Sequence, residues 1–257
     1  MSYYVCIKKI IIICFFFYMF SIKADDAIGG NKSYFPLIRY QPIYAIIGEP
    51  DAKVQFSFKI KVLRNYNFYF AYTQTMFWDV LKNSSPFREI IYNPDFLYRL
   101  DLKENFLNSI DFSFLEHKSN GKGGVDSRAI NRSYLRFNTT ARLGSRDVNW
   151  DTKFFYILNV SDNNRDIRDY SSFWDTRISL KYNVKDHFFS DEFYLHFGPG
   201  GKYSGKPFQG FQEVGYRFKV FASKVAPFIY VQVYNGYIED LVQYNVKHTS
   251  YRIGFSI

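Results

Sequence analysis

The sequence predicts an all-β fold, a transmembrane antiparallel β-barrel. Aromatic residues make up 21% of the chain, yet its mean hydropathy is only -0.25. Apolar and polar residues also alternate with a period of two in one segment after another, which favours strands over amphipathic helices. A barrel explains both features, because each strand turns one face to lipid and the other to a polar interior. The periodicity supports about ten to twelve strands.

Residues 1–24 have the pattern of a secretory signal peptide. Two lysines precede an apolar run, Ile10–Ile22, which is shorter than the about 20 residues needed to span a bilayer as a helix. Ala24 is a plausible cleavage point, and the alternative is a retained membrane anchor. Because Cys6 and Cys14 both lie in this segment, the mature chain would have no thiol. A cysteine nucleophile and a thiolate zinc site are thereby excluded.

Residues 25–50 contain the paired glycines Gly29-Gly30 and the prolines Pro36 and Pro42, and we expect a periplasmic N-terminal segment with little regular structure. The barrel is expected over residues 51–257. Its first strand should present Val54, Phe56, Phe58, Ile60 and Val62 on one face and Gln55, Ser57, Lys59 and Lys61 on the other. We expect the charged residues to face the interior and pair there, because a Lys or Arg on the lipid face costs about 2–4 kcal/mol at the bilayer midplane.

The same alternation recurs along the rest of the chain. It is found over residues 148–159, 175–183, 213–220 and 251–257. No segment after the N-terminal one approaches the about 18 consecutive apolar residues of a membrane-spanning helix. The net charge of +9 does not indicate nucleic acid binding, because the lysines and arginines are spread singly through the strands and form no basic stripe.

His117 and Ser119 are the candidate catalytic residues. Residues two apart share one side of a strand, so an imidazole and a hydroxyl are placed together without any distant element. An imidazole can accept the serine proton and so activate the hydroxyl as a nucleophile. Asn131 is a candidate to accept the N–H of the other ring nitrogen, which would set the tautomer and orientation of the imidazole.

The strand that follows these residues predicts where the site lies. One of its faces carries Asn131, Ser133, Leu135, Phe137 and Thr139. The apolar members place Asn131 on the lipid side, so the site is expected on the outside of the barrel. The preceding strand conflicts with this, because the bulky Phe112 and Phe114 have the opposite parity to His117. A β-bulge near Leu115–Glu116 would reconcile the two strands.

Three segments carry distinctive motifs. They read His117-x-Ser-Asn-Gly followed by Ser127-Arg-x-x-Asn-Arg; Tyr72-Thr-Gln followed by Ser84-Ser-Pro-Phe-Arg-Glu; and Val233-Tyr-Asn-Gly-Tyr followed by Tyr244-Asn. Together they resemble outer-membrane phospholipase A, the phospholipase A1 family of Gram-negative bacteria. The resemblance implies about twelve strands in the outer membrane and a Ser-His-Asn triad. It also implies hydrolysis of acyl ester bonds in membrane glycerophospholipids, with phospholipase A1/A2 and lysophospholipase activity.

The resemblance further implies that calcium, bound at the interface of a homodimer, is required for activity. The matching positions here are the hydroxyl of Ser127 and the backbone carbonyl of Lys122, with Ser84 contributed by the partner subunit. Asp162 matches an acidic residue of a second calcium site in the family. Its companion position falls on Gly124, where the family can have Asp, so the sequence leaves that second site open.

Gln74 is the candidate dimer-interface residue. It shares its strand face with Phe68, Phe70 and Tyr72, and an amide among lipid-facing aromatics is costly without a partner. A two-fold dimer would let Gln74 bond across the interface, and the resemblance implies that reversible dimerisation activates the enzyme. The alternative for Gln74 is a register that points it inward. The alternative for the whole chain is a non-enzymatic small outer-membrane barrel, porin-like or structural.

Overall fold

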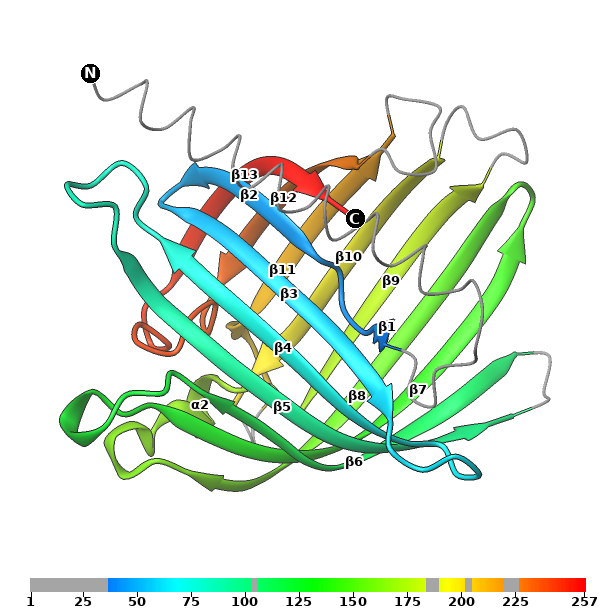
Figure 1. Ribbon diagram of the computed structural model, residues 1–257, viewed down its shortest axis with the longest axis horizontal. Helices are drawn as coiled ribbons and strands as arrows, with labels where there is room; N and C mark the ends of the chain where they lie inside the picture. The colour runs from blue at the N-terminus through cyan, green and yellow to red at the C-terminus, as the bar shows by residue number, and fades with distance from the viewer. Residues whose placement is uncertain (1–36, 103–105, 184–189, 202–204, 220–226) are drawn as a thin grey trace.

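The computed structural model describes residues 37–102, 106–183, 190–201, 205–219 and 227–257. The predicted signal peptide, residues 1–24, lies outside the described residues. The chain forms a closed antiparallel barrel of twelve strands, as predicted (Figure 1). The wall consists of β2 (Tyr44–Glu49), β3 (Ala52–Lys61), β4 (Phe68–Trp78), β5 (Phe87–Asp101), β6 (Leu107–Ser119), β7 (Ala129–Leu143), β8 (Arg146–Val160), β9 (Trp174–Asn183), β10 (Ser190–Gly200), β11 (Lys206–Phe218), β12 (Phe228–Gly236) and β13 (His248–Ser256). Each strand pairs with the next, and β13 pairs with β2 to close the ring.

The prediction that the wall begins after Pro50 is wrong. β2 pairs with β13 on one side and with β3 on the other, and a short strand β1 (Leu37–Arg39) pairs with β3 further along. The sequence pattern missed β2 because its inward residues Tyr44 and Ile46 are apolar, like their outward neighbours. They pack inside the barrel against Tyr194 and Tyr230, so polar and apolar residues do not alternate there.

Charged residues face the barrel interior and pair there, as predicted. Cross-strand ion pairs join Arg99 to Asp111 at 2.7 Å and Arg136 to Asp151 at 3.1 Å. Arg136 and Asp151, with other charged side chains of both signs, line a cavity of about 300 Å³ inside the barrel. The outward positions carry exposed apolar side chains, among them Phe112, Leu135, Phe154, Val214 and Ile253. This inside-out arrangement is that of an outer-membrane β-barrel. Among the described helices, none has the length and apolar character needed to cross a membrane.

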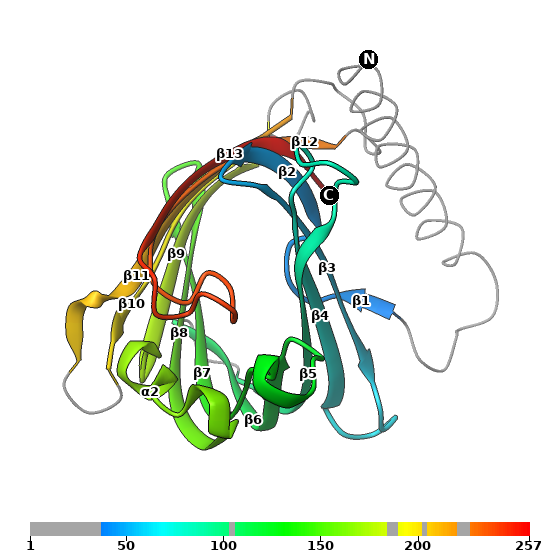
Figure 2. The same ribbon diagram turned by 90° about the vertical axis from the view of Figure 1, so that its left-hand side faces the viewer.

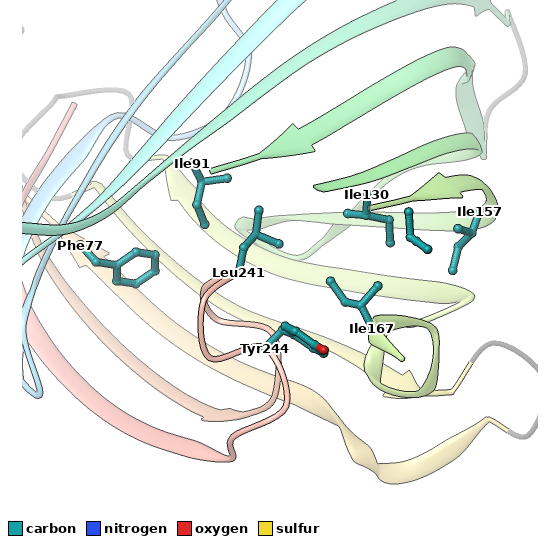
Figure 3. Packing of buried hydrophobic residues seen from close by; sticks show 8 residues of the cluster. Phe77, Ile91, Ile130, Ile157, Ile167, Leu241 and Tyr244 are labelled. Carbon is teal, nitrogen blue, oxygen red and sulfur yellow. The ribbon is translucent and has the colours of Figure 1, made fainter. Parts of the chain in front are cut away.

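The loop between β12 and β13, residues 237–247, turns inward at one end of the barrel (Figure 2). Its Leu241 is fully buried in an apolar cluster with Phe77, Ile91, Ile130, Ile157, Val160, Ile167 and Tyr244 (Figure 3). Its Asp240 pairs with Arg88 at 2.6 Å, and its Glu239 pairs with Lys53 and Arg252. Burial acts to raise the pKa of Glu239, but Lys53 and Arg252 outweigh it and lower that pKa to about 2.

Leu241→Ala should therefore lower the free energy of unfolding by about 2–5 kcal/mol, because it leaves a cavity among rigid strand residues. Denaturant unfolding of the detergent-solubilised barrel measures the change. The neighbouring Val242 is 38% exposed, so Val242→Ala is the matched control and should change stability by less than about 0.5 kcal/mol. Equal losses in the two variants would contradict the assignment of Leu241 to the core.

Candidate active site

The bulge that would reconcile the two strands, near Leu115–Glu116, is present in β6. The pairing of β6 with β7 shifts register between Ser113 and Glu116, and its pairing with β5 shifts opposite Phe96. Before the bulge Ser113 points inward, with no exposed surface. After it Glu116 points inward, so the next residue, His117, faces outward. The extra residue thus reverses the parity of the strand and allows Phe112 and His117 to share the outer face.

His117 and Asn131 are in direct contact on this outer face. They are cross-strand partners in the β6–β7 pair, and 2.6 Å separates His117 Nδ1 from Asn131 Oδ1. An amide oxygen can only accept a hydrogen bond, so Nδ1 carries the proton in this arrangement. The second ring nitrogen, Nε2, then keeps a lone pair and can act as a base.

Ser119 lies two residues beyond His117 on the same face, at the end of β6. Its Oγ accepts a hydrogen bond from the Gly121 amide at 3.2 Å. Gly121 has a φ of +67°, and a Cβ there would come within 2.7 Å of the Tyr92 ring. Glycine is therefore required for the chain to turn so tightly beside the serine. This turn positions Ser119 where β6 ends and the loop to β7 begins.

Asn120 organises that loop, a role that the sequence reasoning missed. The side chain is 5% exposed, and its Nδ2 donates to the Asp126 carbonyl at 2.9 Å. Its Oδ1 accepts from the amides of Lys122, at 3.2 Å, and Arg128, at 3.0 Å. The bond to the amide two residues ahead is the asparagine turn that an Asn-Gly pair favours, so the Asn120-Gly121 sequence carried a usable signal.

The segment after β8 is hydrogen-bonded to the same loop. It contains a short 3-10 turn, Asp162–Asn164, which is followed by helix α2, Ile167–Tyr170. Asn164 is fully buried, and its side chain bonds both the carbonyl and the amide of Ala129 at 3.2 and 3.4 Å. Asn163 donates to the Gly124 carbonyl at 2.7 Å. Ala129 pairs with Ser119, so Asn164 braces the strand opposite the candidate nucleophile.

The predicted calcium ligands lie in this loop and in one other turn. Lys122 is exposed, Ser127 is half-buried, and the 3-10 turn Gly124–Asp126 separates them. Ser84 is exposed in the turn between β4 and β5, where its φ of 63° lies in the left-handed region. Asp162, the candidate for a second site, already forms an exposed ion pair with Arg165 at 2.7 Å.

The chemistry of these donors fits a hard cation. The carbonyl and hydroxyl oxygens are neutral, and Ca²⁺ takes about 6–8 oxygen ligands. Two oxygens from one chain would need further oxygens from a partner chain or water. Within the described ranges, no group of three or more His, Cys, Asp and Glu side chains could hold a metal.

Gln74 faces outward in β4, as predicted from parity. Its neighbour Thr73 is buried in the interior and bonds Ser57 at 2.7 Å, which excludes the inward alternative for Gln74. The expectation that the amide depends on a partner chain is incomplete, because the Tyr72 hydroxyl donates to Gln74 Oε1 at 2.9 Å. Tyr72 in turn packs against Phe58, with ring centroids 5.6 Å apart. The pair forms an outward polar spot on an aromatic wall.

Fold and site together define an outer-membrane β-barrel that carries a His–Asn pair and a serine on its lipid-facing wall. The chain belongs to the phospholipase A1 family, whose model matches residues 33–257. It is 29% identical over 195 residues to phospholipase A1 of Klebsiella pneumoniae, covering 73% of this chain and 61% of the relative. It is 30% identical over 192 residues to phospholipase A1 of Salmonella typhimurium, with coverages of 72% and 60%. The chain thus spans about 60% of the length of these curated relatives.

Solved structures show the same fold. Outer membrane phospholipase A from Escherichia coli superposes with a TM-score of 0.71 at 23% identity, over 91% of this chain and 96% of that one. A Salmonella typhi outer membrane phospholipase, solved as a dimer with bound calcium, gives a TM-score of 0.71 at 25% identity, with coverages of 89% and 94%.

Proposed function

We propose that this chain is a calcium-dependent outer-membrane phospholipase that hydrolyses acyl ester bonds of glycerophospholipids, with phospholipase A1/A2 and lysophospholipase activity. The observation that carries the proposal is the 2.6 Å contact between His117 and Asn131 on the outer wall, beside Ser119. Membership of the phospholipase A1 family supports it.

In this proposal Ser119 attacks the ester carbonyl while His117 Nε2 takes the hydroxyl proton. Asn131 holds Nδ1–H and keeps the ring in the tautomer that leaves Nε2 free, as an orienting residue does in other triads. His117 then returns the proton to the leaving alcohol, and water releases the fatty acid from Ser119 by the same base. A site on the outer wall receives a lipid sideways from the membrane, without passage through the polar interior.

Ser127 and the Lys122 carbonyl, with Ser84 of the partner subunit, would hold calcium in this proposal. When bound, the ion would supply positive charge that stabilises the developing oxyanion. The Salmonella typhi relative with bound calcium supports the requirement. A second site at Asp162 has weaker support, because Arg165 already occupies that carboxylate and the companion position is Gly124.

Release of fatty acid from phospholipid in mixed detergent micelles tests the proposed function. The refolded chain should hydrolyse the ester when calcium is present, and a lysophospholipid should also be a substrate. The alternative is a porin-like or structural barrel with no enzymatic role, which would release no fatty acid from either the phospholipid or the lysophospholipid.

We also propose that the active form is a homodimer joined along the outer face that contains Gln74. Gln74→Leu should weaken the dimer by about threefold, since a polar contact within the membrane contributes about 0.6 kcal/mol on average. Cross-linking over a dilution series in detergent, with activity measured on the same samples, gives the dimer constant. Tyr216→Phe is the control, because it also removes an outward polar group. Tyr216 lies on β11, and its hydroxyl donates to Asp191 of β10 at 3.2 Å. Activity per chain that stays constant from dimer to monomer would contradict the regulatory role.

A further inference from the structure

An ion pair lies directly behind the candidate catalytic pair. Glu116 precedes His117 and Arg132 follows Asn131, and like those two residues they are cross-strand partners in the β6–β7 pair. Because side chains alternate, His117 and Asn131 face outward while Glu116 and Arg132 face the interior. Arg132 Nε and Nη2 lie 2.8 and 2.6 Å from Glu116 Oε2.

The strands are irregular on both sides of this ion pair. The bulge in β6 ends at Glu116, and the β7–β8 pairing shifts register between Asn131 and Arg132. A slip of one residue turns a side chain to the other face of a sheet, so the outward direction of His117 depends on what holds these irregularities. Backbone pairing alone holds them less firmly here than along an uninterrupted ladder, because a bulge leaves the extra residue unpaired.

Buried side chains anchor both ends of the β6 bulge. At its start, Asp95 accepts hydrogen bonds from Ser113 at 2.6 Å, from Tyr134 at 2.6 Å and from Tyr40 at 3.0 Å. At its end stands the Glu116–Arg132 pair. The Arg132 guanidinium also lies 4.1 Å from the Phe155 ring centroid, which restricts how far the ion pair can swing.

We propose that Glu116 and Arg132 are positioning residues, which fix the register between β6 and β7 so that His117 and Asn131 meet on the outer wall. This inference rests on the proposed function. Neither residue touches the substrate, because both face the interior. The pair acts through the backbone on the 2.6 Å contact between the imidazole and the amide. Its loss should impair catalysis more than substrate binding, since the lipid meets the outer face alone.

Glu116→Gln should lower kcat by about tenfold or more and leave KM within about twofold, because small displacements of reacting groups have large effects on rate. It should slow covalent modification of Ser119 by a sulfonyl fluoride to a similar extent. Glu192→Gln is the matched control. Glu192 and Arg217 are also cross-strand partners in a buried ion pair, on β10 and β11, with both side chains 9% exposed. That variant should keep the kcat and the labelling rate of the original chain.

A double variant separates positioning from stability. Removing one member of a buried ion pair leaves an unpaired charge, whereas removing both avoids that penalty. Glu116→Gln/Arg132→Met should therefore resist unfolding almost as well as the original chain, yet keep the low kcat. Recovery of kcat together with stability, or an equal loss in Glu192→Gln, would overturn the inference. If the original chain hydrolyses phospholipid and Ser119→Ala does not, such a result leaves the proposed function standing.

Discussion

Ser119→Ala is expected to abolish phospholipid hydrolysis, lowering kcat by about 10⁴-fold or more, while the barrel stays folded. The substitution removes the oxygen that attacks the ester, and His117 has no other hydroxyl at the same place on the β6 face. Ser119 Oγ accepts one hydrogen bond, from Gly121, so the loss of stability should be about 1 kcal/mol. Fatty-acid release in mixed micelles measures the activity, and the shift of the folded barrel on electrophoresis without heating measures the fold.

Thr140→Ala is the control for this variant. It also removes a hydroxyl: Thr140, far along β7 from Asn131, bonds Asn149 of β8 at 3.1 Å. Its activity should match that of the original chain. His117→Ala should be as inactive as Ser119→Ala, whereas Asn131→Ala should be milder, because it loses the orienting contact and keeps both reacting groups. Normal hydrolysis by the Ser119→Ala protein would falsify the assignment of the nucleophile.

Calcium removal is expected to have the second largest effect. A chelator should abolish turnover, and added Ca²⁺ should restore it, because the ion is proposed to supply the positive charge that stabilises the oxyanion. Ser127→Asn should raise the calcium concentration needed for half-maximal activity. It alters one of the two oxygen donors that the β6–β7 loop is proposed to provide, the Ser127 hydroxyl and the Lys122 carbonyl. Both measurements use the micelle assay over a calcium titration. The chelated protein should stay a folded barrel, because interior ion pairs such as Arg99–Asp111 and the Leu241 cluster do not involve the metal positions.

Full turnover in excess chelator would remove calcium from the mechanism. It would leave the Ser119 assignment untouched, because the nucleophile and the base need no metal ion to meet. Asp162→Asn gives a further comparison within the same titration. If the second site contributes, this variant should also need more calcium, and if Arg165 merely neutralises Asp162 it should behave like the original chain.

Parity was enough to predict which strand face carries His117 and Asn131. The alternation after Asn131 placed that residue on the lipid side, and the conflict with Phe112 would be reconciled by a bulge, which β6 does contain. These predictions succeeded because one lipid face and one polar face impose a strict period of two on the side chains. The same period did not reveal β2, because its inward residues Tyr44 and Ile46 are apolar and fill an apolar part of the interior.

Contacts between segments far apart in the chain could not be predicted from the sequence. Asn164 bonds Ala129 from the segment after β8, and nothing in its neighbours indicates that it is fully buried. The inward turn of the β12–β13 loop likewise depends on Leu241 meeting residues from β4, β5, β7 and β8. The Tyr72–Gln74 hydrogen bond joins residues two apart, but it depends on the rotamers of both side chains, which the sequence does not give. Parity alone suggested a contact between Gln74 and a partner subunit instead.

Covalent labelling tests directly whether an activated serine lies on the outer wall beside His117. The original chain is treated with a sulfonyl fluoride in detergent with calcium, digested, and sequenced by mass spectrometry. We expect one modified residue, Ser119, with loss of hydrolysis in proportion to its labelling, and far slower labelling in His117→Ala. Inactivation with the adduct on another residue, or labelling of Ser119 at the same rate in His117→Ala, would contradict it.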